Sequence, residues 1–226
     1  MIFRHRRRVA FALAVSLLTG SFVAACSANG GGSPTVGPST AASVAPSGAA
    51  TAECPKSQPE ALAAGETRTV TIETNKGTIT MSLKADLSPI AVGNFVALAD
   101  CGYFNGVVFH RLVPGFVIQG GDPTGTGTGG PGYTITDEPV TTAYHRGTVA
   151  MARTEQPNSV GSQFFIVVDD AAQPALASAN TYQIIGEVTA GMDVVDTIVA
   201  MPNSGQSSGN QALDPVPMTK VTVSNP

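Results

Sequence analysis

An arginine inside an apolar run is the first feature of this chain that suggests chemistry. The run VFHRLVPGFVIQGGD, residues 108–122, carries Arg111 and Gln119 among valines, phenylalanines and glycines. A guanidinium surrounded by apolar side chains costs free energy unless a hydrogen-bonding partner compensates it. Taken alone, Arg111 is most simply a surface residue that pairs with an acid, so the rest of the chain must decide its role.

Several other kinds of chemistry find no support in the sequence. Ser162 lies in VGSQF, which lacks the second glycine of a nucleophile elbow, so a serine hydrolase is not expected. Neither a lysine nor a helix signal follows the run GTGTGG, residues 125–130, and we interpret it as a loop and not as a phosphate site. His110 and His145 stand at no metal-ligand spacing. We therefore expect no metal and no cofactor.

The elements that would position Arg111 are mostly short strands. The segment RTVTIETNKGTITMSL, residues 68–83, alternates apolar and polar positions on either side of residues 75–77, which predicts a β-hairpin. Ser88 and Pro89 mark the start of a helix that Gly102 ends. Further strands are expected near residues 108–111, 116–119, 147–152, 163–168, 183–188 and 216–223, with a second helix over 190–200. This succession predicts a closed all-β barrel with two helices and not an α/β sheet.

Residues 1–25 have the layout of an export signal. Four arginines among the first eight residues precede an apolar stretch, which is too short and too often interrupted for a membrane span. The sequence Val23-Ala24-Ala25-Cys26 resembles the lipobox of bacterial lipoproteins, in which Cys26 would be lipidated and become the first residue. An ordinary secreted protein cleaved near Ala25 is the alternative. The general and the twin-arginine export routes both stay open.

Without the export signal the chain is strongly acidic. The chain of 226 residues has 12 Lys and Arg against 16 Asp and Glu, and residues 1–25 contain four of the arginines and no acid, so removing them leaves a formal charge of −8. Such a chain should repel nucleic acid and anionic lipid head groups. We therefore expect no nucleic-acid partner, and the contact with the membrane would come through the lipid alone.

Composition divides the rest of the chain into a tether and a folded domain. Residues 26–65 are predicted to be the lipidated cysteine and a disordered tether, because residues 27–52 carry no charge and are rich in Ser, Gly, Ala, Pro and Thr. The folded domain is expected over residues 66–226. Cys54 and Cys101 are left as a pair, either bridged in an oxidising compartment or as two independent thiols. No C-x-x-C motif is present, so a thiol oxidoreductase is not expected.

Three long segments together resemble one protein family. FHRLVPGFVIQGGDPTGTGTGGPG over residues 109–132, VAMARTEQPNSVGSQFFIVV over 149–168 and IIGEVTAGMDVVDTI over 184–198 are similar to the cyclophilin-type peptidyl-prolyl cis-trans isomerases. The resemblance extends from Thr69 to Val223 in the family's order and spacing. It implies a closed eight-stranded antiparallel β-barrel capped by α-helices, with a substrate groove on its outer face.

The same resemblance assigns the site residues. It implies that Arg111, Phe116 and Gln119 are catalytic. It also implies substrate-binding roles for Val117, Ala152, Arg153, Gln163, Phe165, Leu176 and Tyr182. Taken alone, Phe116 and Phe165 would more often be core residues, and only the family spacing turns them into pocket residues. The loop over 169–181 is longer than usual, so the residue matched by Leu176 stays open by one or two positions.

The chain departs from the family pattern at four places. Methionine is usual where Val117 stands, asparagine where Arg153 stands and histidine where Tyr182 stands, and the tryptophan that often precedes the position of Leu176 is missing. The resemblance then implies a shallower pocket floor, weak cyclosporin binding and an altered peptide preference. None of these changes touches Arg111.

The implied activity is rotation about the amide bond that precedes a proline. This reaction breaks no bond, so it needs neither a nucleophile nor a metal, and Arg111 would act by donating a hydrogen bond to the twisted amide. The expected partners are proline-containing polypeptides among exported or surface proteins, met by a monomer outside the cytoplasm. The alternatives are a non-catalytic proline-peptide-binding module or holdase chaperone and a purely structural envelope protein.

Overall fold

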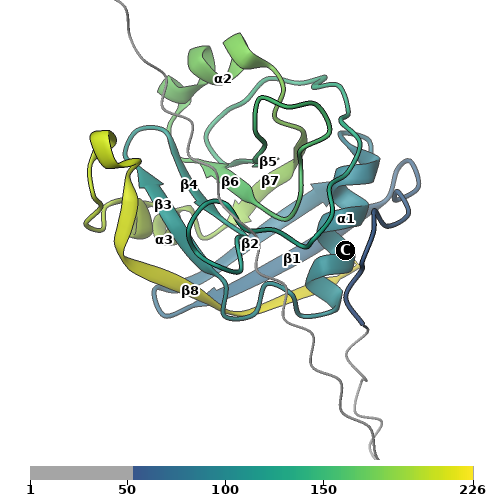
Figure 1. Cartoon of the computed structure of the whole chain (residues 1–226), viewed down its shortest axis with the longest axis horizontal. Helices are drawn as coiled ribbons and strands as arrows, with labels where there is room; N and C mark the ends of the chain where they lie inside the picture. Colours follow the sequence, from purple (N-terminus) through teal and green to yellow (C-terminus); the bar gives the residue numbers. More distant parts are fainter. Residues whose placement is uncertain (1–52, 226) are drawn as a thin grey trace, which may run out of the picture. The chain divides into compact units, whose positions relative to one another are not determined.

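The structure, a computed structural model, describes residues 53–225, which form a closed antiparallel barrel (Figure 1). Neighbouring strands follow the order β1-β2-β7-β5-β6-β4-β3-β8 around the barrel. In chain order the elements are β1 (Thr67–Thr74), β2 (Gly77–Lys84), α1 (Pro89–Asp100), β3 (Val108–Val113), β4 (Val117–Gly120), β5 (Thr148–Met151), β6 (Phe164–Val167), the 3-10 turn η1 (Asp170–Ala172), α2 (Gln173–Ala179), β7 (Ile184–Ala190), α3 (Met192–Val199), the 3-10 turn η2 (Gln206–Ser208) and β8 (Gln211–Ser224). The predicted eight-stranded barrel is confirmed.

The two faces of β6 belong to two different apolar clusters. Phe164 and Ile166 are fully buried in the large core inside the barrel, where the ring of Phe164 meets the edge of Phe95 from α1 at 5.2 Å. Phe165 and Val167 point to the opposite face and join a smaller cluster outside the barrel wall. Successive side chains of a strand alternate between the faces of its sheet, so one strand serves both the core and the outer surface.

Strand register brings the predicted site residues side by side on that outer face. Arg111 of β3 is paired with Gln119 of β4, and Gln119 is paired in turn with Phe165 of β6. Directly paired residues on one face of an antiparallel sheet have their Cβ atoms about 4.5–5.5 Å apart. Three residues that are far apart in the sequence therefore form one row across three neighbouring strands.

A third helix lies in the segment that the sequence analysis treats as a loop. Helix α2 ends at Asn180, which adopts a left-handed conformation with φ of 44°, and Figure 1 shows α2 at the upper edge of the barrel. The expectation of two helices is corrected by this finding. Only Leu176 of the seven helical residues is buried, so the sequence offers no apolar periodicity from which the helix could be predicted.

The start of helix α1 is also stabilised differently from the expectation. Pro89 stands in the first turn as predicted, but the side chain of Ser88 caps no helical N–H group and donates to the carbonyl of Leu87 instead. The carboxylate of Glu138 accepts hydrogen bonds from the backbone of Ile90 and Ala91, both at 2.9 Å. Glu138, which is distant in the sequence, thus satisfies the N–H groups at the start of the helix that Ser88 was expected to cap.

Residues 53–65 pack against the barrel domain, although the sequence analysis assigns them to the tether. This lead runs beside α1 (Figure 1), and its Cys54 forms a disulfide with Cys101. Leu62 donates a backbone hydrogen bond to Pro89, and a Cβ atom on Gly93 would lie 2.3 Å from the carbonyl oxygen of Glu60. The glycine therefore allows the lead to approach the helix closely.

The predicted export signal, Cys26 and the uncharged stretch 27–52 lie outside the described residues. Within residues 53–225, no helix combines the length and the apolar character that crossing a bilayer requires.

Candidate functional site

A cleft of about 190 Å³ on the outer face of the barrel gathers nine of the ten predicted site residues. Strands β3, β4 and β6 supply one wall, and the segment from α2 to the start of β7 supplies the other. The cleft is lined by Arg111, Phe116, Val117, Gln119, Ala152, Arg153, Phe165, Leu176 and Tyr182. Gln163 lines the neighbouring hollow. Leu176 is the residue of the segment 169–181 that lines the cleft.

The floor of the cleft is apolar and firmly packed. Val117, Phe165 and Leu176 belong to one buried cluster, and the side chain of Phe165 is only 4% exposed. The ring of Tyr182 meets the ring of Phe165 edge-on, with centroids 5.4 Å apart and an angle of 85°. Such a floor suits a small apolar ring, and it offers no group that could react with one.

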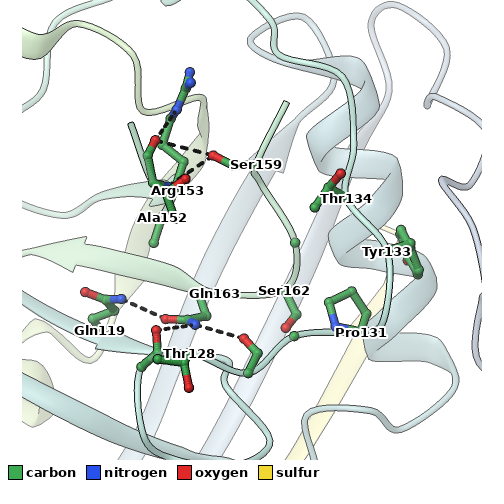
Figure 2. A pocket seen from close by; sticks show the side chains of 15 residues that line it. Gln119, Thr128, Pro131, Tyr133, Thr134, Ala152, Arg153, Ser159, Ser162 and Gln163 are labelled. Atoms are coloured by element: carbon green, nitrogen blue, oxygen red, sulfur yellow. Dashed lines mark hydrogen bonds between the residues drawn. The ribbon is translucent and has the colours of Figure 1, made fainter. Parts of the chain in front are cut away.

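Arg111 is held at the rim of this floor by neutral partners. Its Nη1 atom donates to Oε1 of Gln119 at 3.2 Å, and its Nε atom donates to the carbonyl oxygen of Gly209 at 3.3 Å. Gln119 then donates from Nε2 to Oε1 of Gln163 at 2.9 Å (Figure 2). The two glutamines thus fix the orientation of the guanidinium while leaving its charge intact.

The charge of Arg111 is the only arginine charge in the described residues that no carboxylate neutralises. Arg68, Arg146 and Arg153 each form an ion pair, with Glu66, Asp196 and Asp137 respectively. Burial lowers the pKa of Arg111, and the charge interaction with Tyr182 raises it. An arginine stays protonated in proteins despite such shifts, so the cleft contains a fixed, uncompensated positive charge beside its apolar floor.

A larger hollow of about 390 Å³ continues from the cleft, and the two share Gln119, Ala152 and Arg153 (Figure 2). Gln163 connects them, because its Nε2 atom donates to the carbonyl oxygens of Gly127 and Gly129 at 3.0 and 2.9 Å. The shared residues make the cleft and the larger hollow one continuous groove. Its second half is edged by the glycine-rich loop.

One carboxylate shapes the glycine-rich loop. Asp122 is fully buried and accepts hydrogen bonds from the backbone of Thr124, Gly127 and Gly129. Burial by itself would raise the pKa of Asp122, but these bonds and one from the Thr124 hydroxyl together lower it to about 2. The sequence analysis assigns no role to this aspartate, because most of its partners are backbone groups, which no sequence pattern marks.

Comparison with known proteins agrees with this geometry. Residues 69–223 match the family model described as cyclophilin type peptidyl-prolyl cis-trans isomerase/CLD. The chain belongs to the cyclophilin-type peptidyl-prolyl cis-trans isomerases. The match runs from within β1 to within β8 and includes every residue that lines the cleft.

Individual relatives place the chain within that family. Peptidyl-prolyl cis-trans isomerase CYP57 of Arabidopsis thaliana is 40% identical over 153 residues, which are 66% of this chain but only 29% of that longer relative. Peptidyl-prolyl cis-trans isomerase CYP18-1 of the same plant is 40% identical over 159 residues, 68% of this chain and 94% of its own length. The chain therefore spans less than a third of the first relative and nearly all of the second.

Solved structures give the same result. The crystal structure of a cyclophilin type peptidyl-prolyl cis-trans isomerase of Cryptosporidium parvum is similar with a TM-score of 0.63 and 34% identity, over 71% of this chain and 99% of the other. The same Cryptosporidium cyclophilin has been solved in the presence of the dipeptide ala-pro, with a TM-score of 0.62 to this chain.

The structure of this cyclophilin also contains a residue that sequence reasoning missed entirely. Tyr144 lies beneath the cleft in the same apolar cluster as Phe165 and Leu176. Its hydroxyl donates to the carbonyl oxygen of Tyr182 at 2.9 Å and accepts from the Tyr182 amide at 3.2 Å. No local motif surrounds Tyr144, and a separation of 38 residues hides this pairing from any pattern in the sequence.

Proposed function

We propose that this cyclophilin accelerates rotation about X-Pro bonds in exported or surface proteins and so assists their folding. The observation that carries the proposal is the uncompensated guanidinium of Arg111 at the rim of the apolar cleft that Val117 and Phe165 floor. A proline ring fits such a floor, and its amide nitrogen would then lie beside the charge. Uncatalysed rotation takes tens of seconds, which is slow enough to limit folding.

The reaction explains why both features are needed. The rotation barrier is about 18–20 kcal/mol, because twisting the amide removes its resonance. In the planar amide the proline nitrogen shares its lone pair with the carbonyl and accepts no hydrogen bond. In the twisted amide the lone pair is localised on a pyramidal nitrogen, which can accept one from Arg111. The guanidinium therefore stabilises the transition state more than the ground state.

The apolar floor contributes in a different way. Val117 and Phe165 contact the ring equally in the planar and the twisted state, so they raise affinity without lowering the rotation barrier. A hydrogen bond from a charged donor contributes about 1.5–3 kcal/mol. An acceleration of four to five decades needs roughly 5–7 kcal/mol. The remainder would come from the water-poor cleft and from Gln119, which can hold the flanking carbonyl still.

The decisive experiment compares Arg111→Ala with the unchanged protein in a peptide isomerisation assay and in a peptide titration. The catalytic rate should fall at least tenfold, while affinity for the peptide changes much less. Arg111→Lys keeps the charge but loses the planar donor pair, so it should recover only part of the rate. Equal losses of rate and affinity would contradict a transition-state role. Binding without any acceleration by the unchanged protein would identify a non-catalytic binding module or holdase.

We also propose that the protein acts outside the cytoplasm, attached to the membrane through a lipid on Cys26. The disulfide between Cys54 and Cys101 supports this location, because such bridges persist in oxidising compartments. In a bacterial host, Cys26→Ala should move the protein from the membrane fraction to the soluble exported fraction. An unchanged membrane association of this variant would refute the lipid anchor. Retention of both forms in the cytoplasm would refute the proposed export.

A further inference from the structure

The α2 segment forms one wall of the cleft but has few attachments to the barrel. Between Asp169 and Tyr182, only Ala172 and Leu176 are buried, and the five residues 177–181 are exposed in succession. Helix α2 is stabilised mainly by its own backbone bonds, because a seven-residue helix with one buried side chain gains little from packing. Interactions other than the packing of α2 must therefore set the distance between this wall and Phe165.

Hydrogen bonds from one turn hold both ends of this segment. At its start, the backbone N–H of Arg146 donates to Oδ1 of Asp170 at 2.6 Å. At its end, the hydroxyl of Tyr144 bonds to both the carbonyl and the amide of Tyr182. Within the described residues, no other side chain or loop backbone group outside the segment makes a hydrogen bond to residues 169–182. The segment 144–146, which leads into the turn at 146–147, is therefore a clamp for the wall.

The Tyr144 hydroxyl is well suited to a fixed position. The side chain is 2% exposed, so water does not compete strongly for its hydrogen bonds. Burial raises the pKa of Tyr144, and the hydrogen bond to Tyr182 lowers it by less, so the hydroxyl keeps its proton at neutral pH. The Tyr144 hydroxyl oxygen thus bonds to both the carbonyl and the N–H group of Tyr182, and the two bonds together fix the backbone of that residue.

The position of the Tyr182 backbone determines where the Tyr182 ring lies in the cleft. Its ring packs edge-on against Phe165, and the phenol lies close enough to Arg111 to influence that charge. A shift of the Tyr182 backbone would therefore change the width of the apolar floor, while Arg111 stays held by Gln119 and Gly209. Tyr144 itself lines neither the cleft nor the larger hollow.

We infer that Tyr144 is a positioning residue of this enzyme, whose hydroxyl sets the wall of the proline cleft by holding the backbone of Tyr182. This inference rests on the proposed isomerase function. It assigns a role in substrate binding to a side chain that never touches the substrate. Removing the hydroxyl should loosen the wall and weaken ground-state binding, while leaving the contact between Arg111 and the twisted amide available once the peptide is bound.

The test is Tyr144→Phe in the full-length protein, which removes one oxygen and keeps the ring. The KM for an Ala-Pro-containing peptide should rise about three- to tenfold, as expected for lost hydrogen bonds, and kcat should stay within about twofold. Hydrogen exchange at the Tyr182 amide should become faster. Affinity measured by titration should fall with KM, and this readout remains valid even if the unchanged protein binds peptide without catalysing rotation.

Tyr103→Phe is the matched control, because Tyr103 lines neither the cleft nor the larger hollow and its hydroxyl bonds at 3.1 Å to Ser162, which lies in the larger hollow and not in the cleft. It should lower stability by a similar amount and leave KM unchanged. Asp170→Ala, an exposed change that removes the other end of the clamp, should raise KM in the same direction by a smaller factor. An unchanged peptide affinity in Tyr144→Phe, a loss confined to kcat, or an equal rise of KM in Tyr103→Phe would overturn the inference.

Discussion

The two walls of the cleft are built in different ways. The wall that carries Arg111, Gln119 and Phe165 consists of three paired strands whose other face is the core of the barrel. The opposite wall, with Leu176 and Tyr182, is a short helical segment held by hydrogen bonds at its two ends. The strand wall cannot move without disturbing the core, whereas the helical wall can shift while the barrel stays folded.

This difference suggests a division of labour. The charge of Arg111, which we propose recognises the twisted amide, lies on the rigid wall, where a displacement of about 1 Å would cost much of its effect. Leu176 and Tyr182, which would contact the proline ring under the same proposal, lie on the adjustable wall, where small shifts should affect affinity more than rate. Variation at the adjustable wall, such as Tyr182 and the segment before Leu176, would then change which peptides bind while leaving the rotation chemistry in place.

The largest effect is expected from neighbouring phenylalanines on the two faces of β6. Phe164→Ala should lower the free energy of unfolding by about 3–5 kcal/mol, because it opens a sealed cavity in the core. Phe165→Ala should cost less, because the space that it leaves adjoins the cleft and can fill with water, but it should remove most of the peptide affinity. Urea unfolding and peptide titration of both variants measure the two effects. If the two variants lost similar stability and bound peptide with similar affinity, the two faces of β6 would not differ in the way proposed.

A matched pair of leucines sharpens the comparison between the two walls. Leu112 in β3 is 1% exposed and Leu176 in α2 is 2% exposed, so their burial is nearly equal. Leu112→Ala should cost about 2–5 kcal/mol of global stability, whereas Leu176→Ala should cost less, because its mostly exposed segment can collapse around the gap. Hydrogen exchange should show the second effect confined to residues 169–182. Equal global losses would mean that α2 is as firmly integrated as the barrel.

The smallest effect concerns the glycine-rich edge of the groove, which depends on a charge. The folded-state pKa of Asp122, about 2, lies below its ordinary value, so the carboxylate contributes stability that is fully present above about pH 4 and is lost as the pH falls toward 2. Asp122→Asn should therefore be less stable than the unchanged protein by about 1–2 kcal/mol at pH 7. The difference in the free energy of unfolding between the two proteins should shrink below pH 4, and urea unfolding at several pH values would measure it. If this difference in stability did not depend on pH, the charge of the carboxylate would not be what holds the loop.

Much of the barrel could be predicted from local sequence patterns. The alternation of Val70 and Ile72 with polar residues, and of Ile79 and Met81 on the following strand, gave the first hairpin, and all four side chains are fully buried. The cleft residues could be named because family spacing identified Arg111 and Phe165. The small segment at α2 could not be predicted, since its stabilisation comes from partners on a distant turn and not from its own composition.

The sequence by itself determined which residues alternate between core and surface, and which motifs mark the site, because these depend on neighbours a few positions apart. Only the tertiary structure decided which acid caps α1, how residues 53–65 pack, and which hydroxyl holds Tyr182. These choices join residues 27 to 48 positions apart. The free energy of such contacts depends on where the folded barrel places the two partners. The sequence around either partner therefore does not indicate the contact.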